Sequence, residues 1–205
     1  MKKLIQILII VPAISFSQQN IKAINAGIKD YPSLVSDMEC TWCSGKIPVG
    51  NFSSSSNLKS EGKVNYDIKN INDVDLRTVW SEGNANDGVG EFIELIISSE
   101  TEFGSDNKDG FNGQFFIMNG HFKNDAAFKN NSRVKSFKVY HNGFPVCTVQ
   151  LLDIRTFQIF DLKSAIKSLK AGDKLKFEIV DIYPGLKFKD VVITELIGEY
   201  EYKKQ

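Results

Sequence analysis

The sequence predicts an all-β protein, built as an antiparallel β-sandwich of the jelly-roll type. About eight short runs are either almost continuously apolar or alternate between apolar and polar residues, as strands do. Turn-forming Gly, Asn and Pro residues separate these runs, and scarcely any segment has helical periodicity. Phenylalanine occurs fifteen times, which suits a β-rich core, and no internal repeat indicates a propeller or a solenoid.

The chain begins with the features of a signal peptide, which we assign to residues 1–17. Lys2 and Lys3 form a positive start, an apolar run extends from Leu4 to Ile14, and small residues precede Gln18. The run is shorter than the about 20 residues that span a bilayer, and the rest of the chain has no second membrane segment. A buried core helix is the alternative interpretation of the run. We expect export to the periplasm or out of the cell, without a membrane span.

Residues 18–48 lack the strand patterns of the rest of the chain. We expect them to form a leader segment that packs against the main domain. Within it, Ile21, Ile24 and Ile28 have helical spacing, which predicts a short amphipathic helix from Asn20 to Ile28. The remaining residues, 49–205, are predicted to form one domain. Without the signal peptide the chain has about 190 residues, enough for a single full core.

The charge balance excludes one class of partner. Lysine plus arginine equals aspartate plus glutamate, at 25 each, and the two signs are interspersed along the chain. Such a chain has no bulk electrostatic attraction to nucleic acid or to an anionic membrane. We therefore expect no nucleic-acid partner.

Three cysteines, Cys40, Cys43 and Cys147, are an odd number, so one is left over if a pair forms in an oxidising compartment. The spacing of Cys40 and Cys43 resembles a redox CxxC motif. The sequence SGKIP directly after it breaks the helix which such a site needs. A zinc site would need a second Cys or His pair, and the only histidines are His121 and His141. We expect a structural disulfide or unreactive thiols.

The strands of the main domain are predicted in chain order from their patterns. Residues 92–97 are almost continuously apolar, which predicts a strand buried on both faces. Residues 135–140 alternate, and Asn142-Gly143 after them is the strongest short hairpin signal. A single helical turn around Leu162 and Ile166 interrupts the strands. The other strands are expected at residues 115–118, 146–152, 157–160, 175–179 and 191–200.

Two segments resemble a known family. Residues 70–80 (NINDVDLRTVW) resemble a loop of discoidin-like, galactose-binding-type jelly rolls, with Val74 in place of that loop's Gly. Residues 80–93 (WSEGNANDGVGEFI) are similar to the glycan-binding domain found beside bacterial NAD-glycohydrolase toxins, with Phe92 in place of Trp. The resemblance covers roughly residues 50–202 and implies a galactose-binding-type sandwich that binds a glycan. Shorter stretches agree in order and spacing, at residues 118–121, 131–134, 183–190 and 193–196.

The loop after Trp80 also suits a sugar by its own chemistry. Its glycines surround amides and a carboxylate, which hydrogen-bond sugar hydroxyls, and aromatic faces stack on pyranose rings. Binding residues gather on loops at one end of a rigid sandwich, so this loop is expected to act with residues 119–123 and 183–190. The predicted glycan-binding residues are Trp80, Glu82, Asn84, Asn86, Asp87, Glu91, Asn119, His121, Arg133, Tyr183, Lys187 and Asp190.

Structural alternatives stand beside these assignments. Trp80 begins a strand, which favours burial of its ring in the sandwich over contact with a sugar, and the loop can be merely solvated. Arg133 is suited to clamp an acidic sugar, but an ion pair with Asp153 or Asp190 would occupy it instead.

The resemblance further implies a structural calcium ion, which takes oxygen ligands. Against it, the β-branched Val74 resists the positive φ that the family's Gly allows. The alternative is an Asx-type turn at Asp73, with Glu195 paired to a lysine or arginine. The predicted ligands are the carbonyls of Asn70, Asp75 and Thr194, the carboxylates of Asp73 and Glu195, and the hydroxyl of Thr78.

No catalytic arrangement is recognisable in the sequence. It has no G-x-S-x-G elbow and no phosphate-binding Gly loop with Lys and Ser or Thr. Glu91 and Glu94 would point to opposite faces of a strand, so they do not form a glycosidase pair. We expect a carbohydrate-binding module without catalysis. The alternative is a structural or protein-interaction sandwich that lacks a sugar site, and the sequence does not indicate an oligomeric state.

Overall fold

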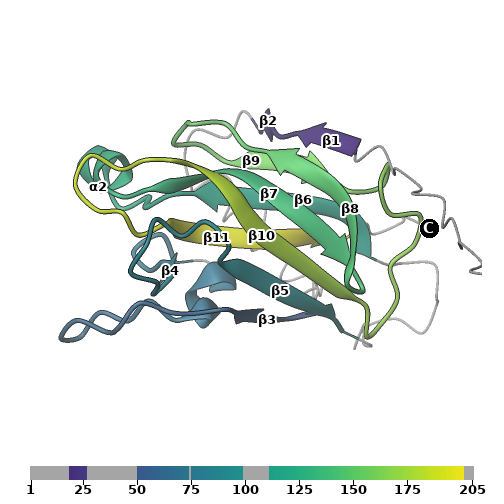
Figure 1. Ribbon diagram of the computed structural model, residues 1–205, viewed down its shortest axis with the longest axis horizontal. Helices are drawn as coiled ribbons and strands as arrows, with labels where there is room; N and C mark the ends of the chain where they lie inside the picture. The colour runs from purple at the N-terminus through teal and green to yellow at the C-terminus, as the bar shows by residue number, and fades with distance from the viewer. Residues whose placement is uncertain (1–18, 27–49, 74, 99–110, 201–205) are drawn as a thin grey trace, which may run out of the picture.

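The computed structural model describes residues 19–26, 50–73, 75–98 and 111–200, and it contains two β-sheets packed face to face (Figure 1). The first sheet has six strands, in the order β1 (Gln19–Lys22), β8 (Phe144–Gln150), β7 (Arg133–His141), β10 (Lys174–Tyr183), β5 (Phe92–Ile97) and β3 (Gly50–Ser54). The second sheet has five strands, in the order β2 (Ile24–Asn25), β9 (Gln158–Asp161), β6 (Phe111–Asn119), β11 (Val192–Tyr200) and β4 (Trp80–Ser81).

Neighbouring strands run antiparallel, except for β1 and β8, which are parallel. In the part of the chain that the structure describes, the helices are the 3-10 helix η1 (Ile68–Asn72) and the six-residue α2 (Asp125–Asn130). The predicted all-β sandwich is therefore confirmed.

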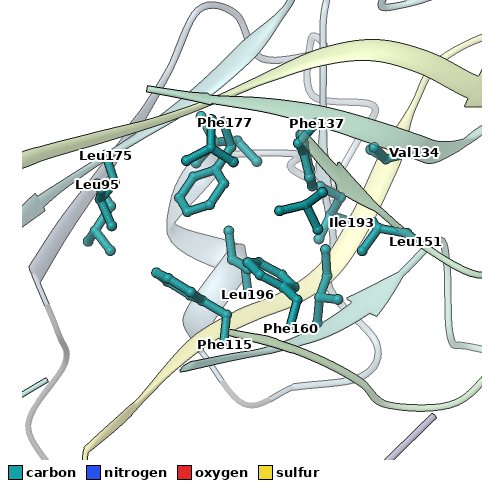
Figure 2. Packing of buried hydrophobic residues seen from close by; sticks show 14 of the residues in the cluster. Leu95, Phe115, Val134, Phe137, Leu151, Phe160, Leu175, Phe177, Ile193 and Leu196 are labelled. Atoms are coloured by element: carbon teal, nitrogen blue, oxygen red, sulfur yellow. The ribbon is translucent and has the colours of Figure 1, made fainter. Parts of the chain in front are cut away.

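Aromatic rings from both sheets meet at the centre of the core (Figure 2). Phe177 of β10 lies edge-on to Phe115 of β6, with ring centroids 5.2 Å apart. It also lies edge-on to Phe137 of β7 at 5.8 Å and to Phe160 of β9 at 6.2 Å. All four rings are buried, so Phe177 connects the packing of the two sheets.

Strand β5 corrects one sequence prediction. Ile93 and Leu95 are fully buried, but Phe92 and Glu94 are half-buried and Ile96 is 37% exposed. The strand therefore buries one face only. The other face lies on the outside of the sandwich, where the Lys176 ammonium sits 5.2 Å from the centroid of the Phe92 ring. The predicted burial on both faces is wrong because no further layer covers this sheet among the described residues.

The predicted helix from Asn20 is also wrong over the described residues 19–26, which form two short strands. Ile21 lies opposite Val149 in the parallel pairing of β1 with β8, and Ile24 lies opposite Ile159 in the pairing of β2 with β9. Ile21 and Ala23 are buried two residues apart, which is the period of a strand. The edges of β8 and β9 offer hydrogen-bonding partners to this segment. Pairing with these strands therefore determines its structure, although the spacing of its isoleucines fits a helix.

Of the three cysteines, Cys40 and Cys43 lie outside the described residues, as do the signal peptide and residues 27–49. Cys147 is buried on β8, and this burial raises the pKa of its thiol to about 12. A thiol with such a pKa carries almost no thiolate near neutral pH, which supports the expectation that it is unreactive.

The β7–β8 hairpin turns with the backbone that Asn-Gly predicts, because Asn142 and Gly143 have φ of 50° and 85°. The Asn142 side-chain amide donates to Asp173 Oδ1 at 2.9 Å, and His141 Nε2 lies 3.0 Å from Asp173 Oδ2. The hydrogen bond from Asn142, with those from the Lys170 amide and from His141, lowers the pKa of Asp173 to about 2.

This lowered pKa predicts an acid-dependent contribution to stability. The folded-state pKa of Asp173 lies below its usual value, so its contribution is present above about pH 4 and is lost as the pH falls toward 2. D173N should therefore lower the free energy of unfolding by about 1 kcal/mol at pH 5, and by less at pH 2.5. Urea unfolding of both proteins at a series of pH values measures this difference, and a pH-independent difference would contradict the assignment.

None of the helices in the described residues is long and apolar enough to cross a membrane.

Candidate functional site

Three connections meet at one end of the sandwich, which we call the loop end and which lies at the left of Figure 1. The Glu82 amide donates to the Val191 carbonyl at 3.2 Å, because β4 pairs with β11. Gly120, just after β6, donates its amide to the Val192 carbonyl at 3.1 Å. Ser132, just before β7, donates its amide to the Asp190 carbonyl at 3.2 Å. The three predicted loops therefore lie together.

A buried carboxylate anchors the first of these connections, residues 82–91, which we call the amide loop. Glu82 is fully buried, and its two carboxylate oxygens accept the Asn84 amide at 2.7 Å and the Val191 amide at 3.2 Å. Burial, opposed by these hydrogen bonds, raises the pKa of Glu82. A Cβ on Gly88 would lie 2.8 Å from the Val191 side chain, and its φ of +80° also favours glycine. The loop backbone is thus held against β11, and Glu82, which was predicted to contact a glycan, instead supports the loop from inside.

A second carboxylate ties the other end of the amide loop to the chain before it. Glu91 accepts hydrogen bonds from the Asn84 side-chain amide at 3.0 Å and from the hydroxyls of Ser55 and Ser56. Partial burial raises the pKa of Glu91, but the three hydrogen bonds outweigh this effect and lower it overall. Glu91 is therefore ionised at neutral pH and fixes the orientation of Asn84.

The side chains between these anchors face the solvent. Asn86 and Asp87 are exposed and Asn84 is half-buried. Asn84 Oδ1 accepts the Asn86 amide and Asp87 Oδ1 accepts the Val89 amide, each at 3.3 Å, so turns within the loop orient the side chains. The amide loop presents two amides and a carboxylate on a fixed backbone.

Trp80 and Asn119 are not placed to contact a ligand. Trp80 is fully buried, and its indole N–H donates to the Ser56 carbonyl at 3.2 Å and to Asn57 Oδ1 at 3.1 Å. Asn119 is also buried, and its side chain exchanges two hydrogen bonds with the Val134 backbone, linking β6 to β7. Both residues stabilise the loop end from inside, which corrects their assignment as sugar contacts.

Arg133 is likewise structural, through the ion pair that was its alternative assignment. Its guanidinium is 8% exposed and forms two hydrogen bonds with the Asp153 carboxylate, at 2.7 and 3.1 Å. It also donates to the carbonyls of Phe128 and Asn131 and lies over the Phe128 ring. With its donors used in this way, Arg133 is unavailable as a clamp for a ligand.

The remaining predicted residues lie at the surface of the loop end. Lys187 is exposed, whereas His121, Tyr183 and Asp190 are half-buried. Burial and the neighbouring Lys123 lower the pKa of His121. The Tyr183 hydroxyl donates to the Leu151 carbonyl at 3.0 Å, so its orientation is fixed.

Sequence reasoning missed the part played by residues 55–57. Ser55 and Ser56 bind Glu91, and Asn57 accepts from Trp80. The serines appear in the sequence as a plain polar run, and only the pairing of β3 with β5 brings them to the amide loop. No local signal could have identified them.

The turn predicted to bind calcium brings three of the proposed ligand oxygens together. The Thr78 hydroxyl lies 2.8 Å from an Asp73 carboxylate oxygen and 2.9 Å from the Asp75 carbonyl. The Asn70 side-chain amide donates to the Val79 carbonyl at 2.8 Å and to Asn65 Oδ1 at 3.0 Å, so this side chain holds the turn together. The Asp75 carboxylate pairs with Arg77.

The second part of the predicted calcium site lies on β11, which packs against η1. Glu195 is 1% exposed there. The Thr194 hydroxyl donates to the Gly120 carbonyl at 2.6 Å and accepts the Phe122 amide at 3.1 Å. The described residues contain no cluster of three or more Asp, Glu, His or Cys side chains placed to hold a metal. The donor set is oxygen-only and fits calcium, but it depends on carbonyl and hydroxyl groups.

The Asx-type turn that was the alternative is also present. Asp73 Oδ1 accepts the Asp75 amide at 2.9 Å. This bond leaves lone pairs on the Asp73 carboxylate, so the turn and an ion are compatible. Val74 lies outside the described residues.

The chain matches a known protein family over most of its length. The model of the family described as NAD glycohydrolase translocation F5/8 type C domain matches residues 41–198. A search of curated proteins finds no match.

Two solved structures from Clostridium perfringens ZmpB share the fold. One contains its CBM32-1 and CBM32-2 domains and matches with a TM-score of 0.54 and 12% identity, covering 90% of this chain and 42% of that one. The other also contains the M60 catalytic domain and matches with a TM-score of 0.55 and 12% identity, covering 93% of this chain and 18% of that one. This chain thus spans less than half of either, and the likeness concerns the fold.

Proposed function

The chain belongs to the family of NAD glycohydrolase translocation F5/8 type C domains, and we propose that it is an exported module that binds a glycan without catalysis. One observation carries the proposal. The amide loop is fixed by two carboxylates and presents Asn86 and Asp87 toward solvent, beside the half-buried Asn84. Preorganised amide and carboxylate groups suit sugar hydroxyls, because little side-chain freedom is lost on binding.

Three further observations support this proposal. The fold is shared with structures described as CBM32 domains. The described carboxylates Glu82 and Glu91 are engaged by backbone amides, hydroxyls and a side-chain amide, so they hold the loop rather than face a substrate. The family description names translocation, a role that attachment to a surface glycan would serve.

Export is part of the same proposal. Cleavage before Gln18 would leave β1 intact, since β1 begins at Gln19. The mature chain would therefore keep the strand that pairs with β8. Amino-terminal sequencing of the protein from the periplasm or the medium tests this, and a chain that retains residues 1–17 would contradict it.

Retention of the full chain on immobilised glycans tests the binding proposal. We expect retention on at least one neutral or acidic polysaccharide. A failure to bind every member of a broad panel would contradict the proposal and would favour a structural or protein-interaction role.

We also propose that the turn at residues 70–78, with Glu195, holds a structural calcium ion. A ligand that binds only the folded state stabilises it, by about 2.7 kcal/mol at a concentration 100 times Kd. In this size range that corresponds to a rise in Tm of about 5–10 °C in calcium relative to chelator. D73N should abolish the rise, whereas D87N, at an exposed carboxylate of the amide loop, should retain it. Identical melting in both buffers would leave the turn as a purely hydrogen-bonded structure.

A further inference from the structure

The turn at residues 184–190, which we call the basic turn, has a rigidly held backbone. The amides of Leu186 and Phe188 donate to the carbonyls of Lys129 and Asn130, at 3.0 and 2.8 Å. The Gly185 amide donates to the Ser132 hydroxyl at 3.0 Å, and a Cβ on Gly185 would lie 2.4 Å from the Asn130 carbonyl oxygen. The turn therefore packs tightly against the end of α2 (Figure 1).

This rigid backbone keeps apolar side chains in the solvent. Leu186 is 81% exposed and Phe188 is 42% exposed. Exposed apolar groups on a backbone that cannot fold over them are typical of binding surfaces. Phe188 is the aromatic residue of the basic turn, so its partly exposed ring is the one that this turn offers to a ligand.

Lysines surround these apolar side chains. Lys187 and Lys189 alternate with Leu186 and Phe188 along the turn, and Lys129 on α2 is also exposed. The Lys187 ammonium lies 4.9 Å from the centroid of the Phe188 ring. A sugar that packs against the exposed part of this ring would place an acidic substituent next to a cation.

We propose that the glycan bound at the loop end is acidic, with carboxylate or sulfate groups that pair with Lys187 and Lys189 while a sugar ring packs on Phe188. This inference rests on the proposed function and narrows its ligand class. In it, the amide loop binds hydroxyls and the basic turn selects for negative charge.

An anionic membrane fits the same lysines less well. The neighbouring amide loop carries Asp87 and Glu91, and Asp190 ends the basic turn. A flat anionic surface broad enough to contact the whole loop end would meet these carboxylates, whereas a single glycan chain can run along the basic turn alone.

The test compares matched acidic and neutral polymers on the full chain: polygalacturonate with its methyl ester, and chondroitin sulfate with desulfated, carboxyl-reduced chondroitin. We expect at least one acidic polymer to bind about 10-fold more tightly than its neutral partner, and the difference to shrink with added salt. K187Q/K189Q should weaken acidic binding by about 3- to 20-fold, as expected for two exposed ion pairs, and should weaken acidic binding more than neutral binding. F188A should weaken both.

The control K167Q/K170Q removes the same charge from the connection before β10, at the opposite end of the sandwich, and should change nothing. Equal binding of acidic and neutral polymers would overturn this inference and leave the proposed function standing. Binding of none of these polymers would overturn this inference, and the proposed function would then be decided by the broad glycan panel. Binding to phosphatidylserine vesicles in place of every polymer would assign the lysines to a lipid surface and would also overturn the inference.

Discussion

F177A should lower the free energy of unfolding by about 3–5 kcal/mol, which is the usual cost of emptying a buried phenylalanine site. Phe177 is fully buried and packs edge-on against Phe115, Phe137 and Phe160, so its loss opens a cavity between the two sheets. For a chain of this size the change corresponds to a fall in Tm of about 6–20 °C.

Thermal and urea unfolding of the two proteins measure this effect. F144A is the matched control, because Phe144 is 74% exposed beside the hairpin turn, and it should change stability by less than about 1 kcal/mol. If F177A melted within about 3 °C of the native protein, the aromatic cluster would not be the centre of the core.

Strand positions in the main domain can be predicted from local patterns. The run at residues 92–97 became β5, and Asn142-Gly143 formed the turn after β7. The first signal is local because aromatic and β-branched residues favour strands, and the second because a hairpin turn demands a left-handed backbone that Asn and Gly adopt.

Other elements are invisible to local patterns. Ile21 and Ile24 have a spacing that fits a helix, yet they lie in two short strands that pair with the edges of β8 and β9. Helix α2 is only six residues long, too short for a periodic signal. Its one local mark is Asn124, whose side chain caps the helix by accepting the Ala127 amide.

The candidate site also has a part that the sequence predicts and a part that it does not. Glycines and amides mark the amide loop in the sequence, so its place at the loop end was predictable. Whether a side chain there faces inward depends on distant partners. The indole N–H of the buried Trp80 donates to residues 56 and 57, which lie more than twenty residues earlier in the chain. The guanidinium of Arg133 donates to the Asp153 carboxylate, twenty residues later.

The triple variant N84A/N86A/D87A should lose glycan binding while it keeps the fold. Three hydrogen-bonding side chains at about 1 kcal/mol each amount to about 3 kcal/mol, or a fall in affinity of about 100-fold. N84A removes the hydrogen bond from Asn84 to Glu91, but the bonds of Glu82 to two backbone amides and of Glu91 to Ser55 and Ser56 remain, so the Tm should fall by less than about 5 °C.

Calorimetric titration of the best-retained glycan into the native chain and into this variant is the most direct test of the proposed function. N51A/S53A, which removes polar groups from exposed positions of β3, is the matched control and should bind as the native chain does. We predict saturable binding by the native chain and the control, and about 100-fold weaker or undetectable binding by the triple variant at nearly unchanged Tm. Equal affinity of all three proteins would place the glycan away from the amide loop and contradict the account.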